Sequence, residues 1–131
     1  MKKSLLLFFL LVSLTSCHQS IEERAEKEAK EYTEKYCPTP VNNFTRTDSV
    51  VFYKDTKTYH YYCSFTDKMD DEAIVNSNRQ KINDDLLMAI KESTALKQYK
   101  EANFTFAYTC RSAQNPKKVL FKGVYTPKQY Q

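Results

Sequence analysis

The segment Asn103-Phe104-Thr105-Phe106-Ala107-Tyr108-Thr109-Cys110-Arg111 carries the clearest structural pattern in the chain. Large apolar side chains occupy every second position, and Thr or Ala stands between them. A period of two is typical of a β-strand, because successive side chains point to opposite faces of the sheet. Since one face is so much more apolar, the pattern predicts a half-buried strand of an antiparallel sheet. After the turn-like residues 112–116, the run 119–126 predicts its hairpin partner.

A second hairpin is predicted upstream. Two β-rich runs, 47–54 and 58–66, are separated by the polar residues Asp55-Thr56-Lys57. Alternation along the second run places one set of side chains on the presumed core face and another on the opposite face. The first set is Tyr59, Tyr61, Cys63 and Phe65, and the second is His60, Tyr62 and Ser64.

Two helical segments complete the pattern. Residues 20–36 are rich in Ala, Glu and Lys, with Ser20 as a candidate N-cap and Pro38 as the stop signal. Residues 70–99 predict a second long helix with a kink in the polar stretch 76–80. The order helix-hairpin-helix-hairpin (αββαββ) predicts an α+β fold, with one four-stranded sheet and helices packed on one face. If the second helix joins neighbouring strands, these strands run parallel and the crossover is right-handed.

The amino terminus predicts an export signal. Met1-Lys2-Lys3 is basic, and the apolar run 5–12 is too short to span a bilayer. Leu14-Thr15-Ser16-Cys17 then resembles the lipobox of bacterial lipoproteins. The resemblance implies a signal peptide over 1–16, a lipid on Cys17 and an acylated new amino terminus, palmitate being the expected acyl group. An ordinary secretory signal with an incidental Cys is the alternative. The remaining residues, 17–131, are expected to form a single α+β domain.

A weaker resemblance covers most of residues 20–127. The chain here resembles small envelope lipoproteins of Bacteroidetes whose function is unknown. The similarity lies in Arg46-Thr47-Asp48-Ser49 followed by Tyr59-His60-Tyr61-Tyr62, and in Thr126-Pro127 near the end. This resemblance implies a location in the cell envelope and supplies no catalytic residue. His18, which follows Cys17, does not resemble the Asp of inner-membrane retention, so the outer membrane is favoured over the inner one.

Three cysteines remain if Cys17 carries lipid: Cys37, Cys63 and Cys110. The envelope permits disulfides, and three thiols allow one bridge. Cys63 and Cys110 lie near the carboxyl ends of two strands and on the same face, so we favour this pair. Cys37 competes for either, and an unbridged state stays open. A bridge between Cys63 and Cys110 would stabilise the fold by roughly 4 kcal/mol in the loop-entropy description.

Composition excludes several classes of function. The net charge of +4, with acids and bases interleaved, gives no nucleic-acid signature. The spacing of Cys and His matches no zinc pattern, and no metal or cofactor is expected. His60 and Cys63 point to opposite faces, which disfavours a Cys–His dyad, and no catalytic residue is predicted.

The leading hypothesis is therefore a non-enzymatic binding module. A lipid on Cys17 would hold it on a membrane, and the Tyr-rich outer sheet face would contact a protein or an envelope polymer. His60 and Tyr62 are the candidate residues of that face. The alternatives are a thiol-dependent enzyme that uses an unpaired Cys, and a purely structural envelope protein.

Overall fold

The computed structural model describes residues 19–131, so the predicted signal peptide and Cys17 lie outside the described part. The chain begins with helix α1 (Ile21–Tyr36), strands β1 (Thr45–Tyr53) and β2 (Thr58–Phe65), and the 3-10 turn η1 (Asp67–Met69). Helices α2 (Glu72–Ser77), α3 (Arg79–Glu92) and α4 (Lys97–Glu101) follow. Strands β3 (Thr105–Ser112) and β4 (Val119–Tyr125) and the helical turn α5 (Pro127–Tyr130) complete it. Within these residues no helix has the length and apolarity that a bilayer crossing requires.

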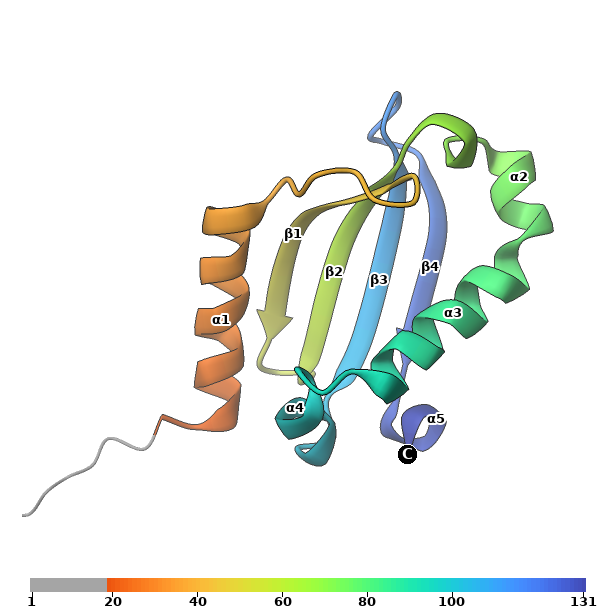
Figure 1. The fold of residues 1–131 in the computed structure, drawn as a ribbon. Coiled ribbons are helices and arrows are strands. Elements are labelled where there is room, and N and C mark those ends of the chain that lie inside the picture. The colour runs from red at the N-terminus through yellow and green to blue at the C-terminus, as the bar shows by residue number, and fades with distance from the viewer. Residues whose placement is uncertain (1–18) are drawn as a thin grey trace, which may run out of the picture.

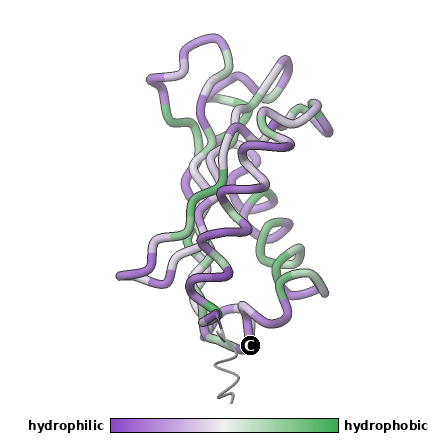
Figure 2. The backbone as a smooth tube through the Cα atoms, turned by 90° about the vertical axis from the view of Figure 1, so that its left-hand side faces the viewer, coloured by the Kyte–Doolittle hydropathy of each residue, from purple (hydrophilic) through white to green (hydrophobic). Residues whose placement is uncertain are grey.

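The four strands form one sheet in the order β1-β2-β3-β4. The β1–β2 and β3–β4 pairs are antiparallel hairpins, and β2 runs parallel to β3. The long connection between β2 and β3 is helical, as the sequence predicted, and consists of α2, α3 and α4. Seen from the side of α1, the helices lie on one side of the strands (Figures 1 and 2). The predicted α+β fold with a four-stranded sheet is confirmed.

Helix α1 packs along the free edge of the sheet. Its N-cap is Ser20, whose hydroxyl accepts a hydrogen bond from the Glu23 amide at 3.1 Å. On the face of α1 that is turned toward the sheet, the Thr33 hydroxyl donates a hydrogen bond to the Val50 carbonyl at 2.9 Å and accepts one from the Val50 amide at 2.8 Å. Those two backbone groups would otherwise be unpaired at the edge of β1, so α1 blocks this edge against further strand pairing.

The helical segment predicted over 70–99 is interrupted within the predicted stretch 76–80, and it is broken a second time at a place that the sequence did not single out. Asn78 stands between α2 and α3 with ψ of 9°, and its side-chain amide donates to the Ile74 carbonyl at 2.8 Å. Such a side-chain bond competes with the helical backbone ladder. The chain leaves the helix again at Ser93 before α4 begins. The breaks let α3 cross the sheet diagonally instead of covering its whole length (Figure 1).

The helix-covered face of the sheet, which we call the inner face, has two halves. The closed half lies under α1, α4, α5 and the end of α3, around Phe104, Phe106 and Tyr125, each with none of its surface exposed. The open half lies at the carboxyl ends of β2 and β3, around Cys63, Phe65 and Cys110, beneath α2 and the start of α3. The predicted inward alternation of both strands is confirmed.

Candidate functional site

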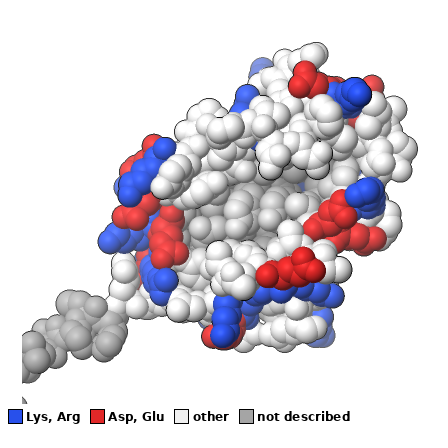
Figure 3. Space-filling model, in the orientation of Figure 1, with Lys and Arg blue, Asp and Glu red and all other residues white. Residues whose placement is uncertain are grey.

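A cavity of about 490 Å³ occupies the open half of the inner face. It lies between the sheet, the loop before β1, the turn η1 and helix α3. Figure 3 shows this face hollowed between α1 and α3, with uncharged side chains in the hollow and charged ones around it. A volume between about 300 and 1,000 Å³ is usual for a ligand-binding cleft.

The floor of the cavity comes from two neighbouring strands. Cys63 and Cys110 are register partners of the parallel β2–β3 pair, and Tyr61 and Tyr108 are the partners two residues earlier. The rings of Tyr61 and Tyr108 stack with centroids 4.7 Å apart. Both strands are paired on both sides, so their backbone groups are committed to the sheet. The floor therefore offers side chains for contact and no free strand edge.

The walls are apolar and only half-buried. Ile82 and Leu86 of α3 and Met69 of η1 face the cavity, and each is partly exposed. All three pack against the buried cluster around Cys63 and Cys110, and the part of each side chain that stays exposed faces the cavity. At the rim, the Lys81 ammonium and the Asp85 carboxylate form an ion pair at 2.6 Å. That pair leaves the interior of the cavity apolar.

Phe44 stands at the mouth in an unusual backbone conformation. Asn42 and Thr45 exchange backbone hydrogen bonds of 2.9 and 3.1 Å around a two-residue turn. Asn43 and Phe44, the central residues, have φ angles of 52° and 59°. Turns of this kind prefer Asn followed by Gly, because an L side chain is disfavoured at positive φ. The Phe44 ring therefore lies at the rim of the cavity, on a backbone conformation that glycine would adopt more easily.

Burial determines the protonation state of the tyrosine hydroxyls and cysteine thiols at the cavity floor. It raises the pKa of the Tyr61 and Tyr108 hydroxyls, so both rings stay neutral. The neighbouring thiols affect each other: the proximity of Cys110 lowers the pKa of Cys63, and the proximity of Cys63 together with burial raises that of Cys110. Among residues 19–131, no cluster of His, Cys and acidic side chains is placed to hold a metal ion. The cavity is suited to an uncharged, apolar group.

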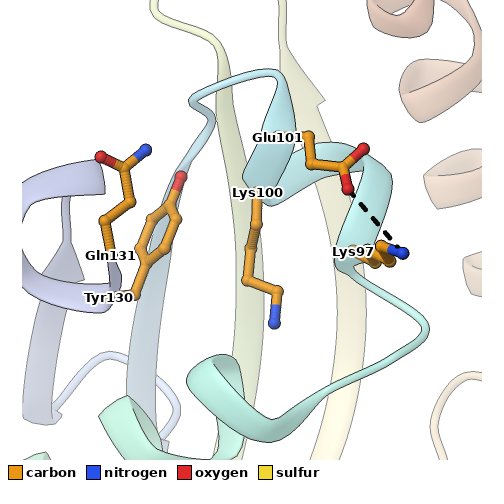
Figure 4. A pocket seen from close by; sticks show the side chains of 5 residues that line it. All are labelled: Lys97, Lys100, Glu101, Tyr130 and Gln131. Atoms are coloured by element: carbon orange, nitrogen blue, oxygen red, sulfur yellow. Dashed lines mark ion pairs between the residues drawn. The ribbon is translucent and has the colours of Figure 1, made fainter.

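A smaller hollow of about 280 Å³ lies between α4 and α5 (Figure 4). Its polar groups already have partners. The Lys100 ammonium donates to the carbonyls of Ile90 and Lys91, both at 2.9 Å, and so caps the end of α3. The Tyr130 hydroxyl donates to the Phe104 carbonyl at 2.6 Å. These contacts join the helices to one another, and we assign the hollow no ligand.

The predicted binding residues His60 and Tyr62 lie together on the outer face, where the alternation of the strand predicted them. Their rings stack with centroids 4.1 Å apart, and the Tyr62 hydroxyl is 2.6 Å from that of Tyr53. His60 Nε2 is 2.8 Å from the Thr109 hydroxyl. Burial, followed by the Lys122 charge, lowers the pKa of His60. The polar atoms of this cluster satisfy one another, and its role in binding stays a prediction.

The predicted disulfide partners are also brought together. Cys63 and Cys110 face each other across β2 and β3, as their placement near the strand ends predicted. The structure holds Cys37, Cys63 and Cys110 as free thiols, so it shows no bridge within the described residues. Cys37, the cysteine that this pairing leaves over, is half-buried, and burial raises its pKa.

Sequence reasoning missed the cavity itself. Its lining residues Ile82, Leu86, Phe44 and Met69 carry no pattern that marks them as a site. The one local signal of the strained turn is the pair Asn43 and Phe44, which stands between Asn42 and Thr45. These two flanking residues pair with each other. Nothing in the order of residues reveals the diagonal path of α3, which opens the space.

The fold and the cavity define a class of protein: a small α+β module with one sheet face partly open between two helices. The chain belongs to the family described as a domain of unknown function (DUF8479), whose profile matches residues 20–121. No curated protein matches the chain in sequence.

Solved structures share the fold. A Pseudomonas aeruginosa protein described as secreted superposes with a TM-score of 0.70 at 13% identity, over 86% of this chain and 98% of the other. The Vibrio vulnificus pilotin EpsS of the type 2 secretion system gives 0.63 at 9% identity, over 84% and 91%. The Vibrio cholerae type II secretion pilotin AspS gives 0.58 at 7% identity, over 82% and 90%. At these identities the likeness shows the fold alone.

Proposed function

We propose that this protein is a non-enzymatic binding module of the bacterial envelope, which holds an apolar helix of a partner protein in the cavity of the open half. The observation that carries the proposal is the uncovered floor. Tyr108 and Cys110 of β3 and Leu86 of α3 face a space of about 490 Å³ that the loop before β1, the turn η1 and α3 leave open. Apolar surface of this kind gains free energy when a partner removes it from water.

The geometry of the cavity favours a helix as the occupant. A bound strand needs a free sheet edge to satisfy its backbone, and β2 and β3 have none. The nearest edge, that of β1, is already occupied by Thr33 of α1. A helix satisfies its own backbone hydrogen bonds and needs only a surface for its side chains. It can therefore lie between α1 and α3 and insert one apolar stripe.

The charged side chains at the rim indicate which charges the partner helix should carry. Figure 3 shows acidic side chains of α1 and of α3 on the two sides of the hollow. Asp85 lines the hollow together with its ion-pair partner Lys81. We expect the partner helix to carry Lys or Arg beside its apolar stripe, because opposite charges at a rim favour encounter and fix orientation.

The structural neighbours support a binding role in the envelope. Two of them are pilotins of type II secretion systems, and the third is described as secreted. The lipobox-like residues before Cys17 support the same location. We propose that a lipid on Cys17 tethers the module to a membrane, the outer one in preference to the inner one. The short polar segment after Cys17 then leads directly into α1.

Site-specific photo-crosslinking in living cells tests the proposal. The probe p-benzoylphenylalanine replaces Phe44 or Ile82 at the cavity, and Val124 or Tyr62 on the outer face. We expect a protein adduct from the cavity positions, mapped by mass spectrometry to an amphipathic helical segment with basic flanks. Adducts from the outer-face positions alone would assign binding to the predicted His60–Tyr62 surface. Adducts from neither set would overturn the proposal.

A matched pair of variants controls for folding. Ile82→Lys places a charge in the cavity, whereas Ile74→Lys places the same charge on α2, where the side chain is 38% exposed. With the probe at Phe44, the adduct should disappear in the first variant and persist in the second. Circular dichroism should show the same helix content in both. Equal adduct yields would contradict a cavity-bound helix.

A further inference from the structure

Two thiols in the floor of the cavity are arranged as a dithiol pair. Cys63 and Cys110 are 47 residues apart in the sequence but are direct register partners in the parallel β2–β3 pair. Neighbouring strands lie about 4.8 Å apart, and disulfides join Cα atoms about 4.4–6.8 Å apart. Both side chains point to the inner face, and both are buried, with 4% and 3% of their surface exposed. The spacing of paired strands therefore falls within the Cα range of a disulfide.

We propose that Cys63 and Cys110 are oxidised to a disulfide that joins β2 to β3 and forms part of the cavity floor. The oxidant is a disulfide, carried by an oxidoreductase or by a small molecule. The Cys63 thiolate attacks one sulfur of that disulfide, whose S–S bond breaks and releases the first thiol. Cys110 then attacks Cys63 in the mixed disulfide and releases the second thiol. Two electrons and two protons pass from the cysteine pair to the oxidant.

The local chemistry fits the order of these steps. The neighbouring Cys110 thiol favours the thiolate form of Cys63 and lowers its pKa, which suits Cys63 to the first attack. The Thr47 hydroxyl, 4.0 Å from Cys63 Sγ, supports the same form. Cys110 keeps its proton until the mixed disulfide has formed, because the proximity of Cys63 and burial both raise its pKa.

Cys37 is the less suitable partner. Thr39 pairs with Thr47 through a backbone hydrogen bond of 2.9 Å, so this part of the chain runs along the outer side of β1. Thr47 is in turn the register partner of Cys63. A strand therefore separates Cys37 from Cys63, whereas nothing separates Cys63 from Cys110.

Oxidation would also act on the proposed binding site, an inference that rests on the proposed function. Both sulfurs line the cavity. The bridge removes two thiol groups from its floor and fixes β2 against β3 at the point where the apolar stripe of the partner would dock. We expect the oxidised protein to give the higher yield of the cavity adduct, and dithiothreitol to lower this yield.

Differential alkylation of the full-length protein tests the bridge without any partner. Cells are quenched in acid, the protein is denatured without reductant, and free thiols are blocked with iodoacetamide before digestion. Mass spectrometry should detect a linked Cys63–Cys110 peptide pair and an alkylated Cys37. Cys37→Ser should keep the linked pair, and Cys110→Ser should make Cys63 alkylatable.

Alkylated Cys63 and Cys110 in the wild-type protein, or a link through Cys37, would overturn the proposal. Failure of the binding proposal is distinguishable from this result. A linked pair together with no adduct from the cavity probes would retain the modification site and remove its assigned role in binding. Adduct yields that do not change with dithiothreitol would contradict the coupling between the bridge and the cavity.

Discussion

The two halves of the inner face differ in the size of the side chains that meet the helices. In the closed half, the β2–β3 register pairs Tyr59 with Phe106, and helices cover the rings from several sides. In the open half, the same two strands present Cys63 and Cys110. The small thiols coincide with the place where α3 diverges across the sheet. The comparison teaches that one continuous sheet face can be a core at one end and a binding surface at the other.

The largest expected effect is a difference in the loss of folding stability between a variant in the closed half and a variant in the open half. Phe106→Ala should lower the free energy of unfolding by roughly 3–5 kcal/mol, because its ring is fully buried in the closed half. Leu86→Ala should lower it by about 1–2 kcal/mol, because one side of Leu86 already faces the cavity. Urea denaturation of both variants measures the difference. Equal losses would show that the open half is packed as tightly as the closed one.

At position 44, in the mouth of the cavity, glycine should be more stabilising than alanine, whereas within a helix or strand glycine is less stabilising than alanine. At positive φ, Phe44→Gly should be more stable than Phe44→Ala by about 1 kcal/mol, because only glycine adopts this conformation freely. Both variants lose the ring, so the loss of packing cancels in the comparison. Urea denaturation gives the order of stability. An Ala variant as stable as the Gly variant would argue against strain at Phe44.

The outer face should tolerate loss of its hydroxyl pair. Burial and the Tyr53 hydroxyl raise the pKa of Tyr62 to about 12, but both groups stay accessible to water. Tyr62→Phe and Tyr53→Phe should each change the free energy of unfolding by about 0.5 kcal/mol or less. The double variant should be no worse than either single one, because the two changes remove the same bond. A loss of several kcal/mol would reveal a structural role for this face.

The sequence predicted the fold well and the candidate site poorly, for a physical reason. Alternation in 58–66 and in 103–111 is a local property, so it predicted which side chains of both strands, Cys63 and Cys110 among them, share the inner face. The cavity depends on where α3 lies, and that follows from Asn78, whose side chain interrupts the helix, and from the packing of α3 on β4. Those contacts are tertiary. The aromatic outer face attracted the prediction of a site because exposure is easier to infer from sequence than an uncovered floor.

The smallest expected effect is the pH response of His60 on the outer face. Its ring is stacked on Tyr62 and half-buried, and burial together with the Lys122 charge lowers its pKa from the ordinary value of 6.5. The folded state therefore prefers the neutral ring. Above pH 6.5 both states are neutral, and the stabilisation is fully present. As the pH falls below 6.5 towards the folded pKa, the unfolded chain takes up the proton first, so stability declines.

His60→Gln removes the titrating group and should flatten the urea midpoint between pH 7.5 and 5, a window in which exposed carboxylates stay largely ionised. Phe106→Ala, in the closed half, should lower the midpoint by the same amount at both pH values, because Phe106 carries no proton to exchange. A wild-type midpoint that rises on acidification, or an equal slope in His60→Gln, would show that His60 does not prefer its neutral form. The pH response would then have to come from groups outside this cluster.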